Sequence, residues 1–198
     1  MNYSRHYSQL DREALMQAVQ MRMSERRFKH VLGVEETAIA LADRYGASTE
    51  KASIAALTHD YAKERSDEEF QLAIEQGNYE NKKELLKFGN AIWHGLVGAD
   101  FVKRELNIND EEILQAIRLH TTGAADMTML DKIIYVADYI EPGRKFPGVN
   151  DARTIALRDL DEAVAFETKH TLSHLIEEER LVYPKTIETY NRWVAGIR

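Results

Sequence analysis

The sequence predicts an all-α fold, built as a single compact helical bundle. Only three of the 198 residues are proline, and apolar residues recur mainly at spacings of three and four, as on one face of a helix. With 44% hydrophobic and 30% charged residues, the chain has the composition of a globular protein that buries a core. No internal repeat, low-complexity tract or linker interrupts it. We therefore expect one domain over residues 1–198, with a core of about 20–140 and C-terminal helices of about 151–195 packing on it.

The first three helices are predicted from residues that start and stop helices. We expect the first near Asp11–Met23 and the second over about 24–45, where Gly46 follows as a C-terminal cap. The third starts after Ser48 and runs through the small-residue stretch KASIAA into the adjacent pair His59-Asp60. Small side chains favour close approach by neighbouring helices.

The later helices follow from the same signals. Ser66-Asp-Glu-Glu69 has the spelling of a capping box and opens a fourth helix that ends at Gly77. Pro184 suits the first turn of the last helix. The remaining expected helices are Lys82–Phe88, Asn90–Leu106, Asp110–His120, Met127–Tyr139, Asp151–Arg180 with a break near Asp159, and Pro184–Ala195. The stretch EPGRKFPGVN, Glu141–Asn150, is the one long loop that we expect.

Charge and cysteine content exclude several classes of function. A net charge of −7 argues against a broad nucleic-acid-binding or anionic-membrane-binding surface. No apolar run exceeds five residues and the N-terminus has no apolar leader segment, so we expect a cytoplasmic protein without a membrane partner. Cysteine is absent, which leaves histidine and carboxylate as the ligands for any metal ion.

Five ionisable residues fall on apolar stripes of five predicted helices. They are His30, His59, His94, His120 and Asp138. A lone histidine in such a position is usually a hydrogen-bonded core residue, and a lone aspartate can pair with Arg or Lys. Five such side chains together would destabilise an apolar core, but they would supply suitable ligands for a metal ion. We therefore expect a metal site between the helices.

Asp60, and the pair His170 and His174, are further candidate metal ligands. Asp60 projects about 100° from its neighbour His59 on a helix, so both reach one ion only if it lies over the wedge between them. The second oxygen of this carboxylate can then reach another ion, which makes Asp60 the natural bridge. His170 and His174 have a chelating spacing of four, but their polar surroundings favour an exposed helix face.

The order His30, His59-Asp60, Asp138 resembles the signature of the HD-domain metal-dependent phosphohydrolases. A longer set of segments, covering roughly residues 20–195, resembles the bacterial YqeK group. These segments are RRFKHVLGVEETAIALADRYG, AALTHDYAKE, WHGLVGADFV, IRLHTTG and LDKIIYVADYIEPGR. The resemblance implies symmetrical hydrolysis of diadenosine tetraphosphate to two ADP at a centre of two divalent ions. Iron is the expected metal, with manganese, cobalt or zinc as alternatives.

The resemblance also assigns roles to single residues. His30, His59, Asp60 and Asp138 match the HD ligand set, and His94 and His120 match histidines that hold a second ion shared through Asp60. We expect catalytic roles for Asp60 and Lys63, because Lys63 follows the pair by three residues and a phosphate near the metals needs a cation. The expected substrate-binding residues are Lys63, Thr121 and Arg144.

The expected reaction is attack of a metal-activated water on a phosphorus of the polyphosphate chain, by a hydrolase acting on phosphoric anhydrides. No P-loop or dinucleotide-binding glycine motif appears in the sequence. The alternatives are another HD-type nucleotidase or phosphodiesterase acting on deoxynucleotides or cyclic dinucleotides, a non-catalytic nucleotide-binding regulator, and a purely structural bundle. The partner we expect is a small nucleotide, not a nucleic acid, and the resemblance also allows a homodimer.

Overall fold

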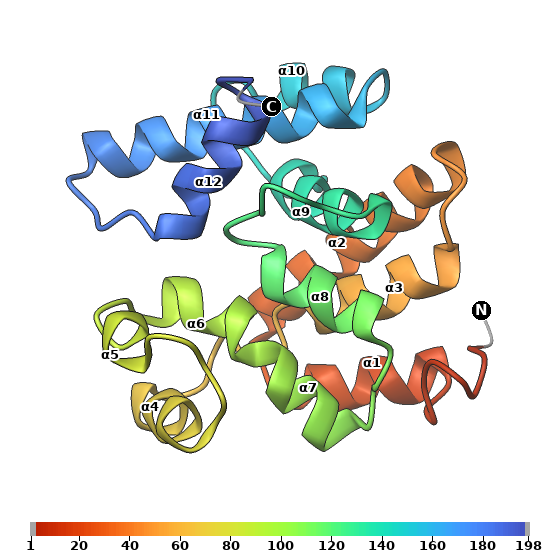
Figure 1. Cartoon of the computed structure of the whole chain (residues 1–198). Helices are drawn as coiled ribbons and strands as arrows, with labels where there is room; N and C mark the ends of the chain where they lie inside the picture. The colour runs from red at the N-terminus through yellow and green to blue at the C-terminus, as the bar shows by residue number, and fades with distance from the viewer. Residues whose placement is uncertain (1–2, 197–198) are drawn as a thin grey trace.

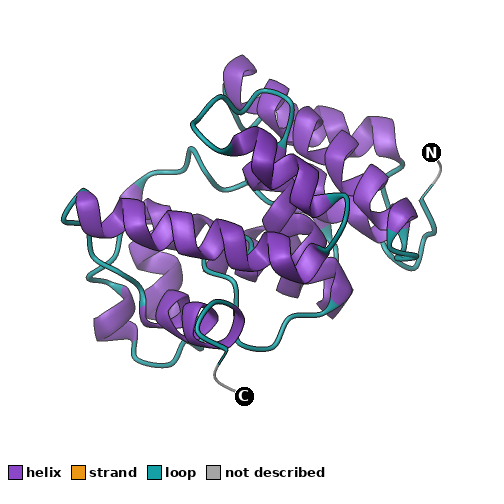
Figure 2. Cartoon of the chain, turned by 90° about the horizontal axis from the view of Figure 1, so that it is seen from above, coloured by secondary structure: helices purple, strands orange, loops and turns teal. Residues whose placement is uncertain are grey.

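The computed structural model describes residues 3–196, and in this range it consists of 12 helices and no strand (Figures 1 and 2). The all-α prediction is confirmed. The helices are α1 Arg12–Gln20, α2 Glu25–Arg44, α3 Thr49–Thr58, α4 Asp67–Gln76, α5 Lys82–Leu85, α6 Asn90–Leu96, α7 Gly98–Leu106, α8 Glu111–Leu119, α9 Met129–Ile140, α10 Val149–Ala156, α11 Leu160–Glu177 and α12 Pro184–Trp193.

Short polar side chains start the helices where the sequence predicts. Ser24, Ser48 and Ser66 each accept a hydrogen bond from a main-chain N–H in the first turn of α2, α3 and α4. The capping box is complete, because the Glu69 side chain accepts in return from the N–H of Ser66. Gly46 follows α2 with φ +67°, a left-handed conformation that costs glycine little.

Several predicted helices end a few residues early in the structure, such as α1 at Gln20 and α5 at Leu85, and two differences bear on the site. The helix expected over Asn90–Leu106 is divided at Val97 into α6 and α7, and at this bend a side chain on Gly98 would come within 3.2 Å of the Ala62 side chain. The bend therefore lets two elements pack closely. The helix expected to carry the HD pair, α3, ends at Thr58, with His59 as its C-terminal cap.

The centre of the fold is α3. All of its residues from Ala52 to Thr58 are buried, so the helix is covered on every side. It packs against α1, α2, α8 and α9, and its alanines allow this close approach, as expected. The C-terminal helices α10 and α11 pack on α9, and α12 packs on α11 (Figure 1). The carboxyl end of α3 is thus enclosed by neighbouring helices.

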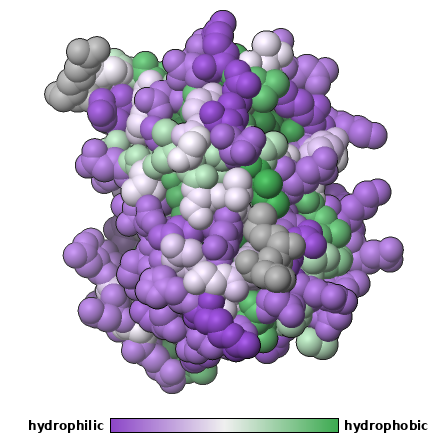
Figure 3. Space-filling model, turned by 90° about the vertical axis from the view of Figure 1, so that its right-hand side faces the viewer, coloured by the Kyte–Doolittle hydropathy of each residue, from purple (hydrophilic) through white to green (hydrophobic). Residues whose placement is uncertain are grey.

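The hydropathy of the helices and of the surface can be compared with what a membrane-spanning segment requires. Over residues 3–196, no helix combines the length and the hydropathy that crossing a membrane requires. On the face shown in Figure 3, hydrophilic residues predominate and hydrophobic residues form small separate groups.

Candidate metal centre

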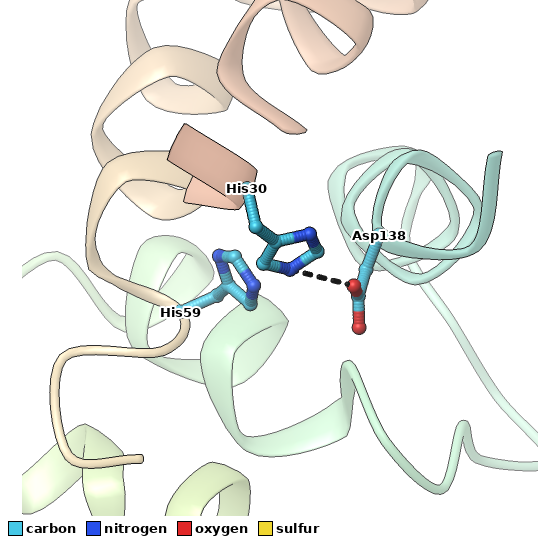
Figure 4. A group of neighbouring side chains, drawn as sticks. All are labelled: His30, His59 and Asp138. Carbon is cyan, nitrogen blue, oxygen red and sulfur yellow. Dashed lines mark ion pairs between the residues drawn. The ribbon is translucent and has the colours of Figure 1, made fainter. Parts of the chain in front are cut away.

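Ligand-type side chains from different helices meet at the carboxyl end of α3. One group consists of His30 on α2, His59 after α3 and Asp138 on α9 (Figure 4). A second consists of His59, Asp60 and His120, which follows α8. Within each group the ligand atoms lie within 4.8 Å of one another. The structure thus brings together residues that are up to 108 positions apart in the sequence (138 − 30).

The Asp60 carboxylate lies between four imidazole rings. Its Oδ2 is 3.6 Å from Nε2 of His30 and 3.5 Å from Nε2 of His59. Its Oδ1 is 3.5 Å from Nε2 of His94 and 3.8 Å from Nε2 of His120. The two oxygens therefore face two different pairs of histidines, as a carboxylate bridging two ions would. This arrangement agrees with the predicted bridging role, although Asp60 lies in a turn after α3 and not within the helix.

The contacts of Nδ1, the second nitrogen of each ring, show which of the two nitrogens carries the proton in the neutral ring. In each ring Nδ1 lies within hydrogen-bond distance of an oxygen: Ala56 O for His59 (2.6 Å), Asn90 O for His94 (2.6 Å), Ile117 O for His120 (2.7 Å) and the Glu141 carboxylate for His30 (3.1 Å). Carbonyl and carboxylate oxygens only accept, so Nδ1 carries a proton, and each ring in its neutral form presents the lone pair of Nε2 to the centre.

These lone pairs are only partly compensated by other protein groups, because the Lys63 ammonium lies 3.2 Å from Nε2 of His94. Nε2 of His59 is buried and has no hydrogen-bond partner within residues 3–196, whereas Nε2 of His30 lies 3.1 Å from Asp138 Oδ1 and forms an ion pair with it when the ring is protonated (Figure 4). Nε2 of His94 and Nε2 of His120 lie 3.0 Å apart. Lone pairs that face one another and a carboxylate repel unless a cation lies among them. The donor set, imidazole nitrogen and carboxylate oxygen with no thiolate, suits a divalent transition-metal ion. The residues present therefore fit the metal that the sequence predicts.

Burial sets the charge of the histidines differently at the two ends of the site. Burial lowers the pKa of His94 well below its ordinary value and lowers that of His120 to about 4, so both rings are neutral at pH 7. Burial also acts to lower the pKa of His30, but the Asp138 and Glu141 carboxylates outweigh it and raise this pKa. For the Asp60 carboxyl, burial is outweighed by the surrounding histidines, which lower its pKa. The carboxylate is ionised and can act as a ligand.

Three cations lie beside the candidate ligands. Nζ of Lys63 is 3.2 Å from both ring nitrogens of His94, and burial lowers the pKa of this lysine. Arg144 donates to the Asp138 carboxylate at 2.5 Å, so the structure pairs this predicted phosphate contact with a predicted metal ligand. Sequence reasoning missed the third cation, Arg27, which donates to Asp60 Oδ2 at 2.8 Å. Its position three residues before His30 on the same helix was a usable signal.

Glu141 was also missed, although it follows Asp138 by three residues at the end of α9. Its buried carboxylate accepts from His30 Nδ1 and from the main-chain N–H of Gly143. A side chain on Gly33 would come within 2.7 Å of Glu141 Oε2, and one on Gly143 within 2.9 Å. The carboxylate therefore occupies a slot that two glycines leave open, and it holds the His30 ring in orientation.

A cavity of about 790 Å³ opens beside the site, between α2 and the 141–145 loop. His30 lines it together with Arg26, Arg27, Lys29, Arg144 and Lys145. Thr121, a predicted substrate contact, does not line this cavity; its hydroxyl is buried without a hydrogen-bond partner among the described residues. His170 and His174 are both exposed on α11, as the polar surroundings indicated.

A histidine, an adjacent His-Asp pair and a later aspartate, brought together from helices around a common centre, define the metal-binding HD class of all-α proteins. The HD domain family model matches residues 27–143, and the chain belongs to this family. The match confirms the resemblance drawn from the sequence, and a divalent metal ion at this centre is what the family implies.

Relatives and a solved structure agree with this assignment. The chain is 45% identical over 187 residues to a Bacillus subtilis protein named symmetrical bis(5'-nucleosyl)-tetraphosphatase, covering 94% of this chain and 100% of the relative. A Staphylococcus aureus protein of the same name is 42% identical, over 86% of this chain and 88% of the relative. A Clostridium acetobutylicum structure, described as a predicted HD superfamily hydrolase involved in NAD metabolism, matches with a TM-score of 0.89 and 38% identity, over 94% of this chain and 98% of that one.

Proposed function

We propose that the protein hydrolyses dinucleoside polyphosphates, foremost diadenosine tetraphosphate, which it cleaves symmetrically to two molecules of ADP. One observation carries the proposal: Asp60 lies among four Nε2 lone pairs in a chain 42–45% identical to proteins named for this activity. Water adds to one of the two central phosphorus atoms, the bridging P–O bond breaks, and each half leaves as ADP.

We assign six residues to two ion positions. His30, His59 and Asp138 would hold one divalent ion, His94 and His120 the other, and Asp60 both. Iron is the metal that the family resemblance favours, and manganese, cobalt or zinc would also suit these ligands. When bound, such ions activate water at neutral pH and neutralise charge on phosphoryl oxygens.

The protein's own cations act on the polyphosphate. Lys63 lies against His94, where its ammonium group can donate to a phosphoryl oxygen placed beside the metal centre. Arg27 and Arg144 line the cavity that opens at His30, each held by a carboxylate of the centre. Fixed donors of this kind stabilise the charge that gathers on the non-bridging oxygens without reorganising during the reaction.

Product analysis tests the proposal. Purified protein supplied with Mn²⁺ or Fe²⁺ is incubated with diadenosine tetraphosphate, and the products are separated by anion-exchange chromatography. We expect ADP as the sole product. Equal amounts of AMP and ATP would show asymmetrical cleavage and contradict the proposal.

Parallel substrates and variants separate the rival functions. Faster turnover of deoxynucleoside triphosphates, mononucleotides or cyclic dinucleotides would identify another HD-type hydrolase. We expect His59→Ala and Asp60→Ala to abolish ADP formation. Nucleotide binding without turnover in the parent and in both variants would identify a regulator instead.

Two further expectations remain predictions. A homodimer, allowed by the family resemblance, would elute with twice the chain mass in size-exclusion chromatography with light scattering. If the protein is cytoplasmic, cell fractionation would recover it in the cytoplasmic fraction.

A further inference from the structure

A second cavity, of about 520 Å³, lies between α6 and the segment that joins α11 to α12. We call it the α6–α12 cavity. Its apolar lining consists of Phe88, Ala91, Ile92, Leu175, Leu181 and Tyr183. Pockets of 300–1,000 Å³ are typical of small-molecule sites, so a nucleoside fits within this volume.

The charged residues of the α6–α12 cavity lie at its rim. Lys87 and the 178–180 segment, Glu-Glu-Arg, are exposed, whereas Phe88 and Thr186 are buried and Tyr183 is half-buried. The cavity at His30, by contrast, is lined by five arginine and lysine side chains and three glutamates, so cations predominate. The two cavities therefore suit different parts of a nucleotide: the charged one suits phosphates, and the apolar one suits a base.

The two cavities adjoin different parts of the metal centre. The His30 and His120 rings both flank His59, with centroid separations of 5.5 and 4.9 Å. The charged cavity is lined by His30 itself. The α6–α12 cavity is lined by Thr121, the residue after His120, and by Ala91, three residues before the ligand-type His94 on α6. A chain of phosphates across the centre would thus have a cavity at each end.

Two features of the α6–α12 cavity fit a nucleoside. The rings of Phe88 and Tyr183 meet edge to face at 5.0 Å, which gives an aromatic wall for a base. The buried Thr121 hydroxyl has no hydrogen-bond partner in the part of the chain that the structure describes, so it is free to bond a ligand.

We propose that the α6–α12 cavity binds the nucleoside of one half of a dinucleoside polyphosphate, with the base against Tyr183 and Phe88 and with Thr121 as a hydrogen-bonding group. The inference rests on the proposed function and deepens it. Symmetrical cleavage requires one nucleoside diphosphate on each side of the bond that breaks, and two cavities at different ends of the centre provide that arrangement.

Photolabelling of the wild-type protein tests the inference directly. The metal-loaded protein is irradiated with 8-azido-ADP, digested and analysed by mass spectrometry, with excess ADP as competitor. We expect ADP-sensitive labels in peptides spanning residues 85–92 or 175–186. Labels confined to other peptides, such as 24–36 and 141–145, or no ADP-sensitive label at all, would overturn the inference.

A cavity-filling variant gives a kinetic test. Ala91→Trp places an indole in the cavity, and Ala40→Trp, on an exposed position of α2, is the matched control. We expect Ala91→Trp to raise KM for diadenosine tetraphosphate and Kd for ADP at least about tenfold, the loss of one base-stacking contact. Metal content should stay at the wild-type level, and the control should bind ADP as wild type does.

The outcomes separate this inference from the function on which it rests. If wild-type protein forms ADP and a folded Ala91→Trp variant has unchanged KM and Kd, the cavity assignment is wrong and the function stands. If wild-type protein forms no ADP from the substrate, the function is wrong, and the photolabelled peptides alone decide whether the cavity binds a nucleotide.

Discussion

The Nε2 atoms of His94 and His120 lie 3.0 Å apart, although the Nδ1 atom of each ring donates to a main-chain carbonyl. Two neutral rings held in this way bring two lone pairs together, and burial keeps both rings neutral by lowering their pKa. The main chain thus fixes an arrangement that cations stabilise: the Lys63 ammonium lies 3.2 Å from Nε2 of His94, and a metal ion bound by both rings would stabilise it further. The predictions for His120, Lys63 and Glu141 depend on this centre, and the prediction for Glu167 concerns the stability of the fold.

Replacing His120 with Asn should remove one ion and leave the other. His30, His59 and Asp138 remain, so we expect elemental analysis to find about one ion fewer per chain than in wild type. Loss of an ion that supplies several kcal/mol of charge stabilisation should lower kcat by at least about 100-fold. His170→Asn, at an exposed position, is the control. Unchanged metal content in His120→Asn would contradict the assignment.

Lys63→Met should reduce turnover without removing metal. The ammonium group contacts His94 and is not itself a metal ligand, so its loss removes charge stabilisation from the substrate. We expect kcat/KM for diadenosine tetraphosphate to fall by about 100-fold at wild-type metal content. Lys132→Met, which removes a lysine paired with Asp161, is the matched control. Equal activities of the two variants would show that Lys63 has no part in the reaction.

Glu141→Gln should weaken metal binding. The carboxylate orients His30 through Nδ1, and loss of such a partner typically costs 10–100-fold in metal affinity. We expect a fall of about this size in affinity for Mn²⁺, measured by competition with a chelating dye. Glu36→Gln, in the same cavity but without a contact to His30, should keep wild-type affinity. Equal affinities of the two variants would show that Glu141 does not support metal binding through His30.

Glu167→Gln should stabilise the protein, and more so at higher pH. Glu167 is buried on α11 with Oε2 unpartnered, and burial raises its pKa well above 4.5. Between 4.5 and the raised value the folded state binds the proton more tightly than the unfolded state, so wild-type stability falls as pH rises. The slope approaches about 1.4 kcal/mol per pH unit, and the neutral amide removes it.

Urea unfolding at pH 5.5 and 7.5 measures this effect. We expect the free energy of unfolding of Glu167→Gln to exceed that of wild type by a larger margin at pH 7.5 than at pH 5.5. Glu177→Gln, on an exposed position of the same helix, serves as the control. A margin that does not grow between pH 5.5 and pH 7.5 would mean that the pKa of Glu167 is not raised in the folded protein.

The helices and the HD residues could be predicted because their signals are local. Ser24, Ser48 and Ser66 mark helix starts through contacts within four residues, and the apolar stripes show which histidines face inward. The bend at Val97 could not be predicted in this way. It depends on the approach of Gly98 to Ala62, a contact 36 residues away (98 − 62).

The same distinction separates the predicted and missed parts of the site. Arg144 was expected to contact phosphate, but the structure pairs it with Asp138, a partner that a loop sequence does not specify. Glu141 depends on space that Gly33 leaves open on another helix. Thr121 was predicted as a substrate contact without a location, and the fold places it in the α6–α12 cavity. Such relationships arise only when separate helices pack together.

Controlled removal and return of metal shows whether hydrolysis depends on ions bound at this centre. Protein treated with a chelator until elemental analysis finds less than about a tenth of the original metal should lose ADP formation from diadenosine tetraphosphate in proportion to the metal lost. Titration with Fe²⁺ or Mn²⁺ should restore it, with saturation near two ions per chain. Undiminished hydrolysis by the metal-depleted protein would contradict the account.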